Sequence, residues 1–161
     1  MDQFLMARRL VEAGVRCVTL WFGSWDRHGA NFSRLPIQLP KLDQGVTALV
    51  QDLHNRGLDQ DVSVIAWGEF GRTPRINKRG GRDHWGRLAP LLIYGGGFEG
   101  GRVIGQSTRD GGQPTADPLG PRHLISSILH TVFDVGELRL RPSVPAPINR
   151  LAEHATIPGM G

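Results

Sequence analysis

Apolar residues recur at helical spacing in three stretches of the chain. Residues 2–13 have a rough apolar face, an aspartate can cap their first turn, and Gly14 ends the pattern. A second helix is expected to begin at Pro40 and to stop at Gly57, and a third to begin near Pro121. The sequence therefore predicts three amphipathic helices separated by stretches of a different character.

Near-continuous apolar runs lie between these helices, at residues 15–22, 62–67 and 90–94. Runs of this length, rich in β-branched residues, are typical of strands that are buried on both faces. A short edge strand is expected at residues 103–108. Cys17, inside the first run, is expected to be a small buried side chain rather than a reactive thiol.

The order of these elements predicts an α/β fold with a mostly parallel sheet flanked by helices. In such a sheet, the loops that follow successive parallel strands emerge at one edge. No internal repeat or clear domain boundary is visible in the sequence. Residues 1–140 are therefore expected to form one unit, followed by an irregular, proline-rich tail at 141–161.

The composition is that of a globular domain with long, tightly shaped loops. Of the 161 residues, 39% are apolar and 21% are charged, while 22 glycines and 11 prolines are many for this length. No apolar stretch approaches the roughly 20 residues needed to cross a bilayer, so no membrane partner is expected. The first residues lack a basic segment followed by an apolar one, so no signal peptide is predicted in this chain, and its localisation stays open.

The net charge of +4 is concentrated in one loop. Around its single acid, this loop carries six basic residues, Arg72, Arg75, Lys78, Arg79, Arg82 and Arg87. Arginine grips phosphate or sulfate with a two-pronged fork, so we expect an anion-binding loop in which Arg72 and Arg82 take part. The alternative is a solvated basic surface without a ligand. A nucleic-acid partner is not favoured, because no basic helix or known binding module accompanies the charges.

Candidate chemistry begins after the first predicted strand. Asp26 and His28 stand two residues apart, so on an extended loop both side chains point to the same side and can reach one cation. A divalent metal held by carboxylate and imidazole can polarise an ester oxygen or lower the pKa of bound water. In the alternative interpretation, Asp26 caps a turn and His28 bonds a backbone carbonyl. For the pair taken alone, this alternative is slightly favoured.

Two later segments extend the candidate site. Glu69 follows the second predicted strand between glycines that let the chain bend toward a ligand; it is a second-metal ligand, a general base or a surface glutamate. His84 can complete a three-ligand site, and Asp83 either ligates the metal or orients an imidazole. The sequence therefore predicts a divalent metal site drawn from Asp26, His28, Glu69, Asp83 and His84.

Three segments in this order resemble a known family. They read Trp25-Asp26-x-His28-Gly29, Gly68-Glu69-Phe70-Gly71-Arg72-Thr73-Pro74-x-Ile76-Asn77 and Gly81-Arg82-Asp83-His84-Trp85. Together they resemble the bacterial domain-of-unknown-function family fifteen-oh-one, which is related to the alkaline phosphatases and sulfatases. The similarity extends from the first helix to about Arg141. It covers only the C-terminal part of the family's usual length.

The resemblance implies an alkaline-phosphatase-like fold, of which residues 1–140 would form the C-terminal half. It implies that Asp26, His28 and His84 hold one divalent metal, with zinc or manganese expected. Glu69 stands at the position of a ligand to a second metal. The activity implied is hydrolysis of a phosphate or sulfate ester, with a small anionic ester as the substrate.

The chain departs from the superfamily's pattern in ways that bear on activity. Glu69-Phe70 stands where an Asp-His or Asp-Asn pair is usual, and the interval from Asp26 to His28 is short. The superfamily's nucleophile lies on an N-terminal segment without a counterpart in this sequence. We therefore expect weak or absent catalysis by this chain alone, and the alternative is a non-catalytic anion- or partner-binding remnant of the fold.

An incomplete sheet would leave an exposed strand edge and an uncovered apolar face. We therefore expect either a homo-oligomer or association with a complementary N-terminal half. Full-length relatives are expected to be exported proteins.

Overall fold

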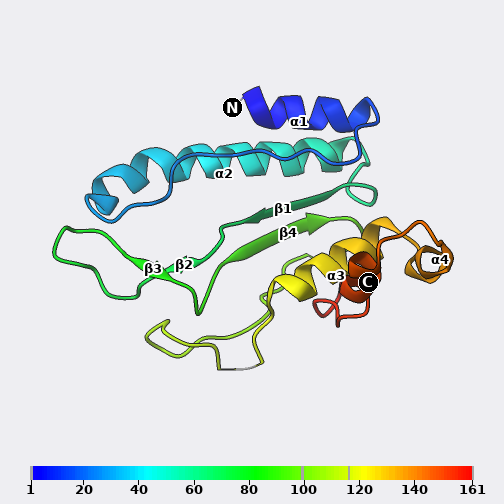
Figure 1. Cartoon of the computed structure of the whole chain (residues 1–161). Coiled ribbons are helices and arrows are strands. Elements are labelled where there is room, and N and C mark those ends of the chain that lie inside the picture. The colour runs from blue at the N-terminus through cyan, green and yellow to red at the C-terminus, as the bar shows by residue number, and fades with distance from the viewer. Residues whose placement is uncertain (1, 99, 116, 161) are drawn as a thin grey trace. The chain divides into compact units, whose positions relative to one another are not determined.

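The computed structural model describes residues 2–98, 100–115 and 117–160 of the chain, which forms two compact units, Met1–Gly97 and Phe98–Gly161. Figure 1 shows how the helices and strands of the first unit are arranged. They are α1 (Asp2–Glu12), α2 (Asn31–Asn55), β1 (Ser63–Trp67), β2 (Gly71–Arg72), β3 (His84–Trp85) and β4 (Leu91–Gly95). The described residues of the second unit form α3 (Pro121–Val132), α4 (Val135–Leu140) and α5 (Ala146–Ala152).

The described strands form two antiparallel pairs, so the prediction of a mostly parallel sheet flanked by helices is wrong. β1 pairs with β4 from Ser63 opposite Gly95 to Trp67 opposite Leu91, and β2 pairs with β3. The cause lies in the connection between β1 and β4. A parallel pair needs a crossover, usually a helix, whereas residues 68–90 contain only loops and the β2–β3 hairpin, so the chain turns back on itself.

The first apolar run, residues 15–22, is not the buried strand that the sequence predicts. The segment is extended, runs back along α2 (Figure 1) and belongs to no strand pair of the described residues. Trp21 in this segment is 86% exposed, and Cys17 is exposed rather than buried. An apolar, β-branched run favours an extended backbone, but a ladder also requires a neighbouring strand. For the same reason residues 103–108 form only an isolated bridge, from Ser107 to Pro114.

The core of the first unit lies where α1 crosses α2. Phe4 and Gly45 are both buried, and a Cβ on Gly45 would overlap the Phe4 ring, so the glycine lets the two helices approach closely. Phe4 also contacts Phe22, with ring centroids 5.5 Å apart, which holds the extended segment against the helices. Across the same interface the buried Arg8 pairs with Asp52 at 2.8 Å.

Helix α2 begins at Asn31, well before the predicted start at Pro40, and includes Pro36 as well as Pro40. Proline inside a helix removes a backbone hydrogen bond, which is why the sequence pattern favours the later start. The early start has a tertiary cause. The N–H groups of Ala30 and Asn31 each donate to a carbonyl of residues 79–80 at 3.1 Å, so the basic loop satisfies donors that a helix start leaves without partners.

In the second unit, α3 begins at Pro121, as the sequence predicts. The fully buried hydroxyls of Ser126 and Ser127 bond backbone groups of the segment that follows α5, at 2.7 and 2.8 Å. The tail after Arg141 is expected to be irregular, but it contains α5, which packs on α3. Such a short helix gives little periodicity, and its contacts with α3 stabilise it. None of the described helices is long and apolar enough to cross a bilayer.

Candidate metal centre

Three side chains of the first unit each bring one metal-ligating atom to the same point. Nε2 of His28 and Nε2 of His84 lie 3.1 Å apart. Oδ1 of Asp26 lies 3.0 Å from the nitrogen of His28 and 2.8 Å from that of His84. Across the described parts of the chain, no other group of three or more such residues gathers its ligand atoms this closely. We refer to Asp26, His28 and His84 as the ligand triangle.

The ligand triangle fits the coordination shell of one small divalent ion. Zinc binds imidazole nitrogen and carboxylate oxygen at about 2.0–2.2 Å in a tetrahedral arrangement, which separates neighbouring ligand atoms by roughly 3.3 Å. Three protein ligands with one position left open are typical of catalytic rather than structural zinc. The side chains are also accessible, since Asp26 is 59% exposed, His84 49% and His28 35%. An ion could therefore enter from solvent, and a small ligand could reach it.

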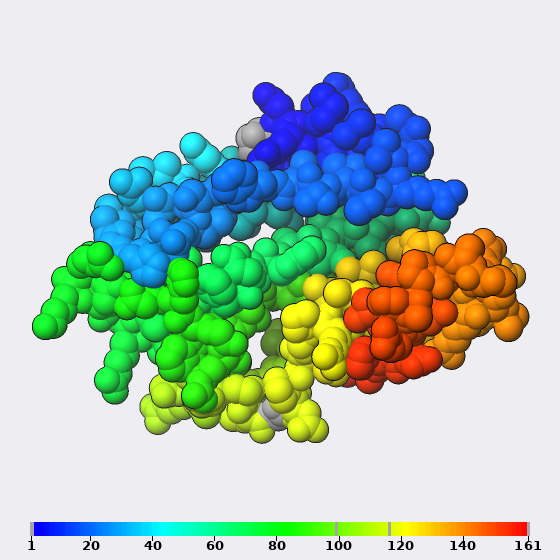
Figure 2. All heavy atoms as spheres, in the orientation of Figure 1, coloured from blue at the N-terminus to red at the C-terminus, as the bar shows by residue number. Residues whose placement is uncertain are grey.

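The ligand triangle is assembled from two segments that are far apart in the sequence. Asp26 and His28 lie on the extended segment before α2, and His84 is the first residue of β3. The N–H of Arg82 donates to the carbonyl of Arg27 at 3.1 Å, beside the two bonds at the start of α2. Figure 2 shows this blue segment lying directly against the green basic loop. The two histidines are therefore held together by the backbone as well as by their side chains.

Gly81 and Asn77 shape the basic loop around His28. Gly81 is buried, and a Cβ there would overlap the backbone of His28, so glycine is needed for the close approach. Asn77 Oδ1 accepts from the N–H groups of Arg79 and Gly81, while its Nδ2 donates to the His28 carbonyl and to Asp83 Oδ1, both at 3.0 Å. Asn77 was not among the predicted site residues. Its place just ahead of a glycine pair is the signal for a turn.

Asp83 lies behind His28 rather than inside the ligand triangle. Its Oδ1 is 2.8 Å from His28 Nδ1, and this bond together with that from Asn77 keeps the pKa of the Asp83 carboxyl below its usual range. A carboxylate can only accept here, so His28 Nδ1 donates to Asp83, and Nε2 is the nitrogen left to bind a metal. Carboxylate–histidine pairs of this kind orient imidazoles that bind metals.

Asp26 is the anionic member of the ligand triangle. Hydrogen bonds from His84 and Arg72 lower the pKa of its carboxyl to about 2, so it is ionised at neutral pH. Nη2 of Arg72 lies 2.7 Å from Asp26 Oδ1, the oxygen that also faces both imidazoles. The Phe70 ring packs on His84 with centroids 4.2 Å apart, and the Arg72 guanidinium lies 5.6 Å from the centre of the Phe70 ring. Phe70 therefore supports both side chains, a role that was not predicted.

Two predicted residues occupy other places. Glu69 is exposed at the end of β1 and does not belong to the ligand triangle. Arg82 points its Nη1 at the carbonyls of Thr73 and Pro74, at 2.6 and 2.5 Å, so this nitrogen holds the loop in shape. Among the arginines predicted to bind an anion, Arg72 is therefore the one in contact with the ligand triangle.

The fold and the site together define a small helix-and-hairpin unit with a surface-accessible His₂Asp group. The chain belongs to the family described as "Protein of unknown function (DUF1501)", whose model matches residues 1–137. No curated protein and no solved structure matches the chain.

Proposed function

We propose that this chain carries the divalent-metal site of a hydrolase that acts on phosphate or sulfate esters, of the alkaline phosphatase and sulfatase type. The ligand triangle carries the proposal, because two imidazole nitrogens and one carboxylate oxygen converge with separations of 2.8, 3.0 and 3.1 Å. The three motifs resemble the chain's own family, and the expected relation of that family to the alkaline phosphatases and sulfatases supports the class of substrate.

Each residue of the site has a separate proposed role. Asp26, His28 and His84 would hold zinc or manganese, which when bound polarises an ester oxygen or lowers the pKa of a water molecule. Asp83 keeps the lone pair of His28 directed at the site, and Arg72 supplies positive charge next to it. Because Glu69-Phe70 stands where the superfamily usually has an Asp-His or Asp-Asn pair, we expect slow or absent turnover by this chain alone.

The first test is the metal content of the purified protein, measured by elemental analysis after incubation with zinc or manganese and dialysis. We expect near-stoichiometric metal in the unmodified protein and its loss in His84→Ala. The matched control is His54→Ala, because His54 also pairs with an aspartate, Asp59, at 3.1 Å but lies outside the ligand triangle. A folded protein that takes up no metal would contradict the proposal, as would equal loss in both variants.

Turnover of p-nitrophenyl phosphate and p-nitrophenyl sulfate then tests the reaction class. The rate should depend on the metal and vanish in His84→Ala, with a full-length member of the family measured in parallel. Metal-dependent turnover that survives His84→Ala in the full-length member would count against the proposed role of the ligand triangle.

The second candidate function is a non-catalytic anion-binding module that keeps the scaffold without the chemistry. The exposure of the ligand triangle favours it, since Asp26 is 59% and His84 49% exposed, whereas hydrolytic sites usually exclude bulk water. This function predicts sulfate binding that persists in a chelator and depends on Arg72 or Arg82. The hydrolase proposal predicts instead that the metal is required.

A further inference from the structure

We propose that Arg72 couples metal binding to anion binding at this site. Its guanidinium pairs with the Asp26 carboxylate, and binding of a metal at the ligand triangle would free it to grip a tetrahedral oxyanion such as phosphate or sulfate. This inference rests on the proposed metal site and adds an order of events to it, with the metal first and the anion second.

The competition arises at a single oxygen. Asp26 Oδ1 lies 2.7 Å from Arg72 Nη2 and faces the Nε2 atoms of His28 and His84 at 3.0 and 2.8 Å. A carboxylate oxygen has about two lone-pair sites, so a metal ion would occupy one of them and draw electron density from the other, which leaves a weaker acceptor for the guanidinium. A divalent cation in the ligand triangle also repels the guanidinium charge. Metal binding therefore weakens the Arg72–Asp26 bond.

The freed guanidinium stays beside the site, because other contacts hold its side chain. Arg72 stands opposite His84 in the β2–β3 hairpin, which fixes the two residues as cross-strand neighbours. Its guanidinium lies over the Phe70 ring at 5.6 Å, and Nη1 donates to the Arg82 carbonyl at 3.5 Å. Only 24% of the Arg72 side chain is exposed. Release of Nη2 would therefore leave a donor beside the ligand triangle.

The charge balance identifies the ligand class. With the metal bound, a divalent cation and a guanidinium lie side by side with Asp26 as the nearest anion, which favours a further anion between them. Guanidinium donors match the oxygens of phosphate and sulfate. By thermodynamic linkage, the metal then raises the affinity for the oxyanion, and the oxyanion raises the affinity for the metal by the same factor.

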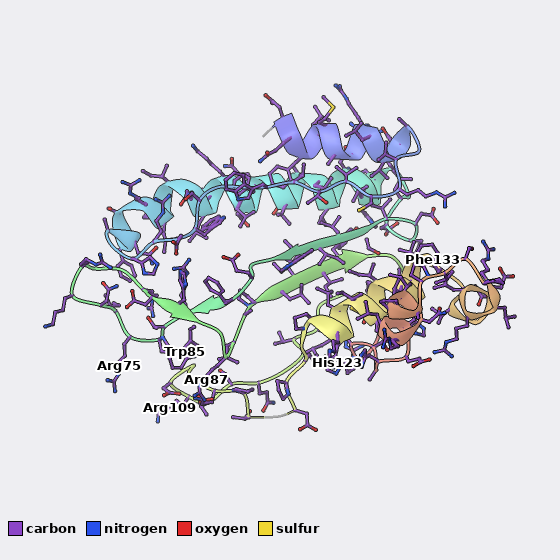
Figure 3. All side chains as sticks on the ribbon, in the orientation of Figure 1. Arg75, Trp85, Arg87, Arg109, His123 and Phe133 are labelled. Atoms are coloured by element: carbon purple, nitrogen blue, oxygen red, sulfur yellow. The ribbon has the colours of Figure 1, made fainter. Side chains whose placement is uncertain are left out.

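The test measures manganese binding and inorganic sulfate binding by titration calorimetry, each with and without the other ligand. The variants are Arg72→Gln, Arg72→Lys and the control Arg75→Gln. Arg75 belongs to the same loop but points away from the hairpin (Figure 3). For Arg72→Gln we expect manganese to bind at least about fivefold more tightly without sulfate, and the coupling to sulfate to fall by a similar factor. Arg72→Lys should show both effects at reduced size, and Arg75→Gln neither.

The outcomes separate this inference from the proposed function. If the unmodified protein binds no manganese, the metal site itself is wrong, and the inference falls with it. If manganese binds but its affinity is unchanged or lower in both Arg72 variants, the metal site stands and the coupling is overturned. Sulfate binding of equal strength with and without manganese would also overturn it. So would a crystal structure with manganese and sulfate bound in which Arg72 still pairs with Asp26.

Discussion

At the scale of single residues, Asp83 acts on the site through His28 and not by direct contact. Its carboxylate accepts from Nδ1 at 2.8 Å and so fixes which nitrogen faces the ligand triangle. We expect Asp83→Asn to weaken manganese binding by roughly 10- to 100-fold, the usual effect of removing such a partner, while leaving the fold intact. Competition with a chromophoric chelator measures this affinity.

The control for Asp83→Asn is Asp59→Asn. Asp59 lies 3.1 Å from Nδ1 of His54, an equivalent aspartate–histidine pair that is separate from the ligand triangle. Its substitution should leave manganese affinity within experimental error of the unmodified protein. If the two variants lose affinity equally, Asp83 has no specific part in orienting His28.

The sequence predicted which residues supply the candidate ligand atoms better than it predicted where each residue lies in the site. Asp26, His28 and His84 meet in the structure because two short motifs carry the right donors in neighbouring segments. The position of Asp83 behind an imidazole was one of two alternatives, and spacing alone could not separate them. The roles of Phe70 and Asn77 depend on which segments lie against each other, and that is decided by tertiary contacts.

At the scale of elements, the β2–β3 hairpin and the segment before α2 form one assembly that holds the ligand triangle. Gly81 is the point of closest approach, because a Cβ there would overlap the His28 backbone. We expect Gly81→Ala to force the two segments apart and to lower the free energy of unfolding by about 1–3 kcal/mol, with weaker manganese binding. Urea denaturation measures the first effect and the chelator competition the second.

Gly86→Ala provides the matched control, at a glycine that directly follows β3. A Cβ at Gly86 meets no atom within 4 Å, so this variant should change the free energy of unfolding by no more than about 0.5 kcal/mol. Equal stabilities of the two variants would show that the loop accommodates a side chain at Gly81. The close packing described for His28 would then be incorrect.

The type of each element could be predicted where the local sequence signal was strong. The prediction failed where the pairing of strands decides the structure. The start of α3 at Pro121 follows from a proline ahead of an apolar face. The apolar run at 62–67 does contain β1. The run itself does not indicate that β1 pairs with β4, or that the pair is antiparallel. The direction of pairing depends on the connection between the two strands. Residues 68–90 form no helix, so the chain returns in the antiparallel sense, but the sequence of this stretch did not indicate that outcome.

At the scale of the whole molecule, the apolar segment at residues 15–22 is the feature that bears on association. In the described structure it is extended and belongs to no strand pair, and Trp21 within it is 86% exposed. An unpaired extended segment with apolar side chains is a template for pairing with another chain. Because antiparallel pairing of a segment with its own copy is symmetric, we expect the purified chain to self-associate through residues 15–22.

Size-exclusion chromatography with light scattering tests this at several protein concentrations. The unmodified protein should show a mass above that of one chain, and Trp21→Asp should shift it toward the monomer by placing a charge in the apolar contact. Leu140→Asp is the control, because Leu140 is similarly exposed at 83% but lies at the end of α4. A compact monomer at all concentrations would contradict the expectation. Equal effects of the two variants would indicate non-specific hydrophobic association rather than pairing of residues 15–22. If Trp21→Asp yields a monomer that still binds manganese, the metal site is complete within one chain.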